Sequence, residues 1–176
     1  MIMPRGHQLL LPANPLFILM SLMLALFTNM VVNMSFVGNA AWMPDFLALV
    51  LVFWCVHQPR LVGIGVAFFF GVATDVHQSA LLGQHALSYT ALGFMAIMVN
   101  RRLLWFTVPS QAMQVLPLFA IAHALELTVR MMSGALFPGG MILVAPLFEA
   151  MLWPVVSIFL LAPQRRAPDP DANRPL

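Results

Sequence analysis

The chain consists of six apolar stretches separated by short polar breaks. The stretches cover residues 15–32, 44–56 (or from Ala40), 61–74, a fourth that ends at residue 99 and starts between residues 79 and 86, 112–129 and 141–162. None of them alternates strictly between apolar and polar residues, and most are longer than a typical strand, which favours helices. The breaks contain proline, glycine or charged residues, as loops do. The pattern therefore predicts an all-α protein with six helices.

The composition places these helices in a membrane. Hydrophobic residues make up 61% of the 176 residues, charged residues only 8%, and the mean hydropathy is +0.91. Soluble proteins carry about 25% charged residues, so a cytosolic enzyme, a disordered chain and a nucleic-acid-binding protein are excluded. With about 20 residues needed for each crossing, the length allows roughly six crossings. The single cysteine, Cys55, excludes a disulfide framework and a thiolate metal site.

The second and third stretches are short for membrane spans. Thirteen residues reach about 20 Å along a helix, against roughly 30 Å of hydrocarbon. A re-entrant hairpin is one interpretation, but its tip would leave Arg60 inside the bilayer at a cost of several kcal/mol. Two short or tilted crossings in a locally thinned bilayer are the favoured alternative.

The arginines predict the orientation of the chain. With six crossings and a cytoplasmic N-terminus, seven of the eight arginines are cytoplasmic and only Arg130 is not; the seven are Arg5, Arg60, Arg101, Arg102, Arg165, Arg166 and Arg174. Such an excess on one side is typical of cytoplasmic loops. We therefore expect one transmembrane domain over residues 1–176, with a cytoplasmic tail at 1–14 and a disordered cytoplasmic tail at 163–176.

Several polar residues lie near the ends of the predicted helices. Pro44 and Asp45 form a helix-start signal at the outer interface, because proline suits the first helical position and an acid suits the positive end of the helix dipole. Asn29 and Asn33 are one helical turn apart, and we expect them to form hydrogen bonds between helices rather than to contact a substrate.

A row of small residues runs along the third stretch. Gly63, Ala67, Gly71 and Asp75 follow one another at intervals of four residues, which places them on one helix face. Small residues at this spacing allow two helix backbones to approach closely. Two interpretations stay open: plain packing with Asp75 at the outer water boundary, or a partner-binding surface that ends in Asp75.

Ionisable residues inside a span are functional candidates. His123, Glu126 and Arg130 lie on one side of the fifth stretch, and Glu126 and Arg130 have the spacing and order of a favourable ion pair. Self-neutralisation of that pair is the favoured interpretation. Glu149 in the sixth stretch is a candidate partner for Arg130 or for another protein.

The sequence predicts neither an enzyme nor a metal site. His123 and Glu126 have no second histidine near them in sequence, and zinc needs three or four converging ligands. The Gly-x-Ser-x-Gly, His-Glu-x-x-His and glycine-rich phosphate-binding motifs do not occur. We therefore expect no catalytic residue and no cofactor.

The order of motifs between residues 44 and 102 resembles the rod shape-determining protein MreD family. Pro44-Asp45 opens the second stretch, an aromatic pair follows it, the glycine-spaced helix ends in Asp75, and a Leu-Gly pair that includes Gly83 precedes the next apolar helix. The resemblance implies a component of the bacterial inner membrane that acts with MreC, MreB, RodA and the penicillin-binding transpeptidase partner of RodA in the elongasome. It also implies a fold similar to the substrate-binding subunits of energy-coupling-factor transporters.

Three functions stay open, and the first is favoured. The first is a non-enzymatic scaffold that links peptidoglycan synthesis enzymes to the MreB cytoskeleton through MreC and so maintains the rod shape. The second is a small-ligand binding subunit of a transporter, with His123, Glu126, Arg130 and Glu149 around a cavity. The third is an intramembrane lipid-handling enzyme.

Overall fold

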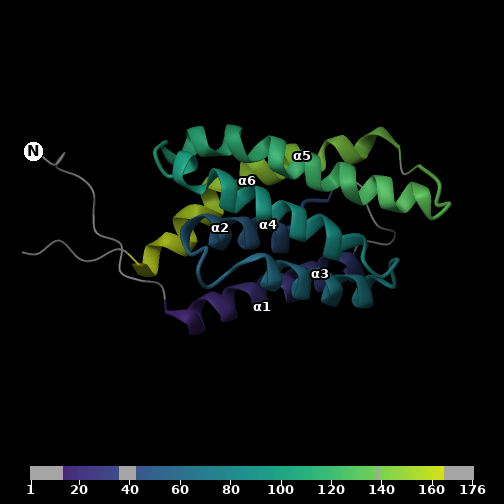
Figure 1. Ribbon diagram of the computed structural model, residues 1–176, viewed down its shortest axis with the longest axis horizontal. Helices are drawn as coiled ribbons and strands as arrows, with labels where there is room; N and C mark the ends of the chain where they lie inside the picture. The colour runs from purple at the N-terminus through teal and green to yellow at the C-terminus, as the bar shows by residue number, and fades with distance from the viewer. Residues whose placement is uncertain (1–13, 36–42, 138, 165–176) are drawn as a thin grey trace, which may run out of the picture.

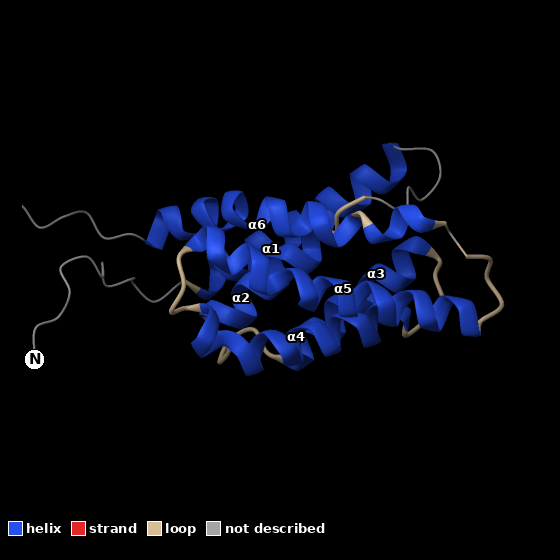
Figure 2. Cartoon of the chain, turned by 90° about the horizontal axis from the view of Figure 1, so that it is seen from above, coloured by secondary structure: helices blue, strands red, loops and turns tan. Residues whose placement is uncertain are grey.

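A computed structural model describes residues 14–35, 43–137 and 139–164, without the side chains of residues 34 and 35. The regular structure of these residues is helical (Figure 2). Six α-helices and two short 3-10 helices follow one another as α1 Pro15–Ser35, α2 Phe46–His57, α3 Ile64–Gln78, α4 Gln84–Leu103, α5 Val108–Met132, η1 Gly140–Leu143, α6 Ala145–Leu161 and η2 Ala162–Gln164. The predicted all-α class is confirmed, with six α-helices in the described part of the chain.

The helices form an elongated bundle with α2 at its centre. Figure 1 shows α1 along one side and α5 along the other, with α2 and α4 between them. Helix α2 packs against α1, α4 and α6, while α3 packs against α4, and α5 packs against both α4 and α6. Helices α4 and α6 therefore connect the central α2 to α5.

The sequence of α2 explains its central position. Its residues are apolar on all sides, and the run from Leu47 to Val56 is buried except for a half-buried Val50. A helix that is hydrophobic all round is normally surrounded by other helices. The 12 residues of α2 extend only about 18 Å, so its first residue lies inside the bundle rather than at its end. This placement brings Asp45 next to buried groups.

Helix boundaries differ from the predicted ones where polar residues continue a helix. Helix α4 extends through Asn100, Arg101 and Arg102 to Leu103, and α3 begins and ends later than expected, at Ile64 and Gln78. Residues 163 and 164, expected in a disordered tail, belong to η2, where the Gln164 amide donates to the Leu160 carbonyl. The other residues of the two predicted tails lie outside the described residues, apart from Asn14.

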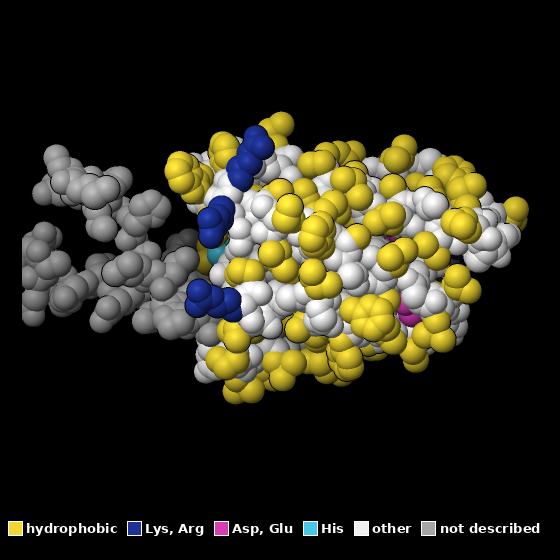
Figure 3. Space-filling view, viewed as in Figure 1, with side chains coloured by type: hydrophobic (Ala, Val, Ile, Leu, Met, Phe, Trp, Pro, Cys, Tyr) yellow, Lys and Arg dark blue, Asp and Glu magenta, His cyan; other side chains and the backbone are white. Residues whose placement is uncertain are grey.

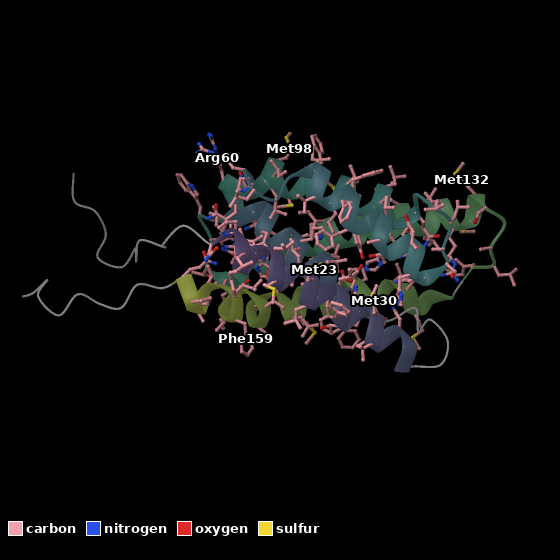
Figure 4. The ribbon with its side chains drawn as sticks, turned by 90° about the horizontal axis from the view of Figure 1, so that it is seen from below. Met23, Met30, Arg60, Met98, Met132 and Phe159 are labelled. Carbon is pink, nitrogen blue, oxygen red and sulfur yellow. The ribbon has the colours of Figure 1, made fainter. Side chains whose placement is uncertain are left out.

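Three helical segments are long and apolar enough to cross a membrane: Pro15–Asn33, Val108–Met132 and Gly140–Gln164. Helix α2 is apolar but shorter. The visible face of the molecule carries many hydrophobic side chains, while arginines gather at one end of the bundle (Figure 3). Arg60 marks that end and Met132 the opposite one, as Figure 4 shows. This arrangement suits a bundle whose long axis crosses a bilayer.

Candidate functional site

A network of buried and partly buried polar side chains links the six α-helices of the described residues. Each helix, or the residue that caps it, contributes at least one member; the members are Asn29, Asp45, Asp75, Gln84, His85, Tyr89, His123, Glu126 and Glu149. Met30, the neighbour of Asn29, lies on the Met132 side of the bundle in Figure 4. The network therefore belongs to the half of the bundle opposite Arg60.

Asp45 is the centre of one part of the network. Its Oδ1 accepts hydrogen bonds from the Ala48 backbone N–H at 2.9 Å and from the Asn29 amide at 2.5 Å. The Tyr89 hydroxyl donates to the other carboxylate oxygen. The contact with Ala48 makes Asp45 the N-cap of α2, as an acidic residue before an apolar helix favours. Pro44 precedes this cap instead of occupying the predicted first helical position.

The same helix start is held from two other helices. The side-chain oxygen Oδ1 of Asn29, in α1, accepts from the Phe46 backbone N–H at 3.0 Å. Glu149 Oε1, in α6, accepts from the Asp45 backbone N–H at 2.9 Å. The first N–H groups of a helix have no partner within the helix. Side chains of α1 and α6 thus satisfy donors that a buried helix end would otherwise leave unpaired. The predicted interhelical role of Asn29 is confirmed.

Asp75 performs the corresponding task for α4. It is fully buried, and it accepts from the backbone N–H groups of Gly83 and His85 at 2.9 and 2.8 Å and of Ala86 at 3.3 Å. Gly83, which has no side chain to cap its own helix, adopts φ +103°, a conformation that favours glycine. A carboxylate at a helix N-terminus is also stabilised by the helix dipole.

Two imidazole rings continue the network from Asp75 to Glu149. His85 lies between Asp75 and Glu126, with ring nitrogens 2.8 and 3.4 Å from their carboxylate oxygens. His123 lies between Glu126 and Glu149, at 3.8 and 2.8 Å. Acidic and imidazole side chains therefore alternate from α3 through α4 and α5 to α6. Since a neutral imidazole donates from only one nitrogen, the position of protons along this row sets its hydrogen bonding.

A polar cavity of about 100 Å³ adjoins the network. His85, His123 and Glu126 contribute to its wall, together with Asp45 and Arg130. Asn29, Asn33, Pro44 and Gln78 also line it. The cavity thus collects both acidic and basic groups, and such a set can bind water, a proton or a small group that carries both charges.

Ala67 and Gly71 of the small-residue row pack inside the protein, whereas Gly63, the N-cap of α3, is half-buried. A Cβ placed on Gly71 would lie 2.4 Å from the Cα of Ala86 in α4. A Cβ placed on Gly93 of α4 would lie 3.2 Å from the Cβ of Ala67. Both α3 residues are buried. Of the two interpretations, the structure supports helix packing, here against α4. It corrects the placement of Asp75 at the water boundary, because the close approach brings the start of α4 over that carboxylate.

The expected ion pair between Glu126 and Arg130 is not formed. Within the described residues, Glu126 faces His85, His123 and the Gln84 amide, which donates to Glu126 at 3.3 Å. Arg130 contributes to the cavity wall and forms no ion pair with a described residue. Glu149 lies against His123 rather than Arg130. The physical reason is that the imidazole rings of α4 and α5 lie close to these acids, and the Asp45 backbone N–H at the start of α2 donates to Glu149.

The sequence interpretation missed three members of the network. His85, Gln84 and Tyr89 are not among the candidate residues of the sequence analysis, yet all three are buried in α4. A signal was present, because His85 and Tyr89 are four residues apart and follow a Leu-Gly turn. Residues at that spacing share one helix face, so a helix beginning at Gln84 would have placed both toward the same neighbour.

Comparison with known proteins identifies the family. No curated protein and no solved structure matches the chain. A family model described as rod shape-determining protein MreD matches residues 13–163, which is nearly the whole chain. The matched region contains all six α-helices and every member of the polar network. The chain therefore belongs to the MreD family and is a membrane protein that determines rod cell shape.

Proposed function

We propose that this protein is a non-enzymatic scaffold of the elongasome in the bacterial inner membrane. In this role it links the peptidoglycan synthesis enzymes to the MreB cytoskeleton through direct contact with MreC. RodA and its penicillin-binding transpeptidase partner belong to the same complex. The observation that carries the proposal is the family match over residues 13–163, because it includes the complete helical bundle.

The geometry of the polar network supports a structural role. Asp45 and Asp75 each bind backbone N–H groups at the start of a buried helix. Glu149 binds the start of α2 from across the bundle. Asp45 and Asp75 are therefore occupied by the fold itself, as expected for a protein that presents a fixed surface to its partners. Glu149 accepts through Oε1 alone, and its buried Oε2 has no hydrogen-bond partner among the described residues.

We propose that both termini are cytoplasmic and that all six helices cross the membrane. Arg60, Arg101 and Arg102 mark the cytoplasmic end, and Arg130 lies in the last turn of α5 toward the opposite end. An arginine excess in cytoplasmic loops supports this orientation. Reporter fusions after Arg102 should indicate the cytoplasm, and fusions after Gln78 or Phe137 the periplasm. A periplasmic signal after Arg102 would refute the six-span arrangement.

The partner surface lies on faces that the bundle leaves exposed. Since Ala67, Gly71 and Asp75 are buried against α4, we place the contact with MreC on the outer faces of α1 and α3. Their exposed side chains are large and apolar, for example Leu24, Phe27, Phe68 and Phe69. They suit packing against a transmembrane helix or against lipid.

A transporter subunit is the second candidate, favoured by the polar cavity. His123, Glu126 and Arg130 line that cavity as this hypothesis expects, whereas Glu149 lies behind His123. The volume of about 100 Å³ is small, because pockets for small molecules usually measure about 300–1,000 Å³. The size of the cavity therefore favours the scaffold.

Depletion of the protein in its native host tests the proposed function. Cells that lose a scaffold of the elongation machinery should become round, and expression of the wild-type chain should restore rods. Affinity purification of a tagged chain should recover MreC. Rod-shaped cells after full depletion would refute the role in shape, and restored rods without recovered MreC would refute the direct link.

A matched pair of variants separates the scaffold surface from the fold. Phe68→Ala changes an exposed side chain of α3, and Phe70→Ala changes a buried one on the same helix. If the outer face of α3 binds MreC, Phe68→Ala should accumulate normally and recover less MreC. Phe70→Ala should instead lower the amount of protein. If Phe68→Ala recovers a normal amount of MreC, the outer face of α3 is not the MreC-binding surface.

A further inference from the structure

The polar cavity adjoins an apolar groove, and the two share part of one wall. The groove has a volume of about 230 Å³ and lies between α5, η1 and α6. Its walls are almost wholly apolar and include Ala120, Ala124, Leu127 and Leu147. His123 and Ile142 line both the groove and the polar cavity. A molecule that occupies both must therefore be polar at one end and apolar along the rest.

The dimensions of the two sites match one leaflet of a bilayer. Arg130 in the last turn of α5 lines the cavity, and Leu116 lines the far part of the groove. The 14 residues from Leu116 to Arg130 correspond to about 21 Å along the helix axis. One leaflet measures about 15 Å of hydrocarbon and about 20–22 Å with its headgroup region. The groove thus leads from the level of a headgroup into the region of an acyl chain.

The charges of the cavity indicate the headgroup. Arg130, which forms no ion pair with a described residue, suits a phosphate. Glu126 on the same wall, whose side chain keeps 22% of its surface exposed, suits a group that is positively charged and donates hydrogen bonds. A primary ammonium donates such bonds, whereas a quaternary ammonium has no hydrogen to donate.

We propose that this junction of cavity and groove binds a zwitterionic aminophospholipid, with its headgroup at the charged mouth of the cavity, near Arg130 and Glu126, and an acyl chain in the groove between α5 and α6. The lipid comes from the leaflet at the end of the bundle opposite Arg60. A transmembrane helix of a partner is the competing occupant of the groove. It would leave the charged wall without a counter-charge, so the side-by-side position of the two sites favours the lipid.

Native mass spectrometry of the purified chain in detergent tests the lipid. Phosphatidylethanolamine, phosphatidylcholine and phosphatidylglycerol with the same acyl chains are added in equal amounts. We expect ethanolamine lipid to be retained roughly tenfold better than either competitor, because choline has no N–H to donate to the carboxylate and the glycerol headgroup has no positive charge to pair with it. Arg130→Gln should lower this retention by a similar factor. Equal retention of the three lipids would refute the headgroup assignment.

Two variants of neighbouring residues test the groove. Ala124→Phe places a ring in the groove, while Ile121→Phe makes a comparable change at an exposed position of α5 that is not part of the groove wall. Ala124→Phe should reduce retention of ethanolamine lipid roughly tenfold, and Ile121→Phe should leave it unchanged. Equal effects of the two variants would refute the site. Unchanged lipid retention by Ala124→Phe together with loss of a co-purifying membrane protein would assign the groove to a protein partner instead.

Discussion

Replacement of Gly71 by alanine should destabilise the protein, whereas the same replacement at Gly65 should not. Both glycines lie within α3, six residues apart. A Cβ on Gly71 would lie 2.4 Å from the Ala86 Cα and 2.7 Å from the Ala86 backbone nitrogen. A Cβ on Gly65 would meet no atom within 4 Å. The pair therefore compares the same chemical change with and without a steric conflict.

The size of the effect follows from the backbone contact. Ordinary van der Waals contact begins near 3.4 Å, so α3 and α4 must separate by about 1 Å to accommodate the new methyl group on Gly71. Overpacking of this kind costs about 1–3 kcal/mol. The two helices cannot easily move apart to relieve the clash, because Asp75 of α3 accepts hydrogen bonds from backbone N–H groups at the start of α4. Gly65→Ala should instead gain about 0.5–1 kcal/mol, since alanine favours a helix over glycine.

Thermal unfolding of the two variants in detergent measures this difference. Gly71→Ala should unfold at a lower temperature than the wild type, and Gly65→Ala at the same or a higher one. If both variants unfold like the wild type, the two helices are not in close contact. If Gly71→Ala is as stable as the wild type but recovers less MreC, the small-residue row faces a partner and its internal packing is refuted.

Three further changes address the polar network. Asp75→Asn should destabilise the protein by about 1.5–3 kcal/mol, because a single amide oxygen replaces the two oxygens that bind backbone donors of α4; thermal unfolding in detergent measures this. Tyr89→Phe should lower the free energy of unfolding by about 1–3 kcal/mol, because it removes the hydroxyl that donates to Asp45, the N-cap of α2. A Tyr89→Phe variant as stable as the wild type would contradict that contact. In double-mutant cycles of stability, the effects of Glu126→Gln and His123→Gln should be coupled, whereas those of Glu126→Gln and Arg130→Gln should be additive. The reason is that Glu126 faces the imidazole and not the guanidinium. Coupling of Glu126 to Arg130 alone would support the ion pair predicted from the sequence.

The sequence predicts the helices well because their signals are local. Apolar runs and the Pro44-Asp45 start of α2 lie within a few residues of the elements they define. Boundaries were less accurate where a polar run continues a helix, as at Asn100–Arg102, because packing and helix propensity hold the turn despite its charge. The face formed by Gly71 and Ala67 was also predicted, but a pattern on one helix does not specify which neighbour covers it.

The network could be predicted only in parts, because its contacts join distant residues. Asp45 and Glu149 are 104 positions apart, and Asn29 and Tyr89 reach the same carboxylate from different helices. Each residue was recognised, or could have been, as a polar group in an apolar helix. The nearest candidate in sequence was the wrong partner for Glu126, since Arg130 on the same helix is outcompeted by His85 from α4.

The polar network specifies how the helices associate, which burial of apolar groups cannot do in a bilayer. Lipid chains are as apolar as leucine, so the hydrophobic effect does not specify how transmembrane helices associate. Hydrogen bonds do, because an unpaired backbone donor in hydrocarbon costs several kcal/mol. Asp45 and Asp75 each satisfy the start of a buried helix, and Glu149 and Asn29 reach the first of these starts from other helices. A bundle held in this way has one arrangement, and a fixed arrangement is what the proposed role as a scaffold for cell-wall enzymes requires.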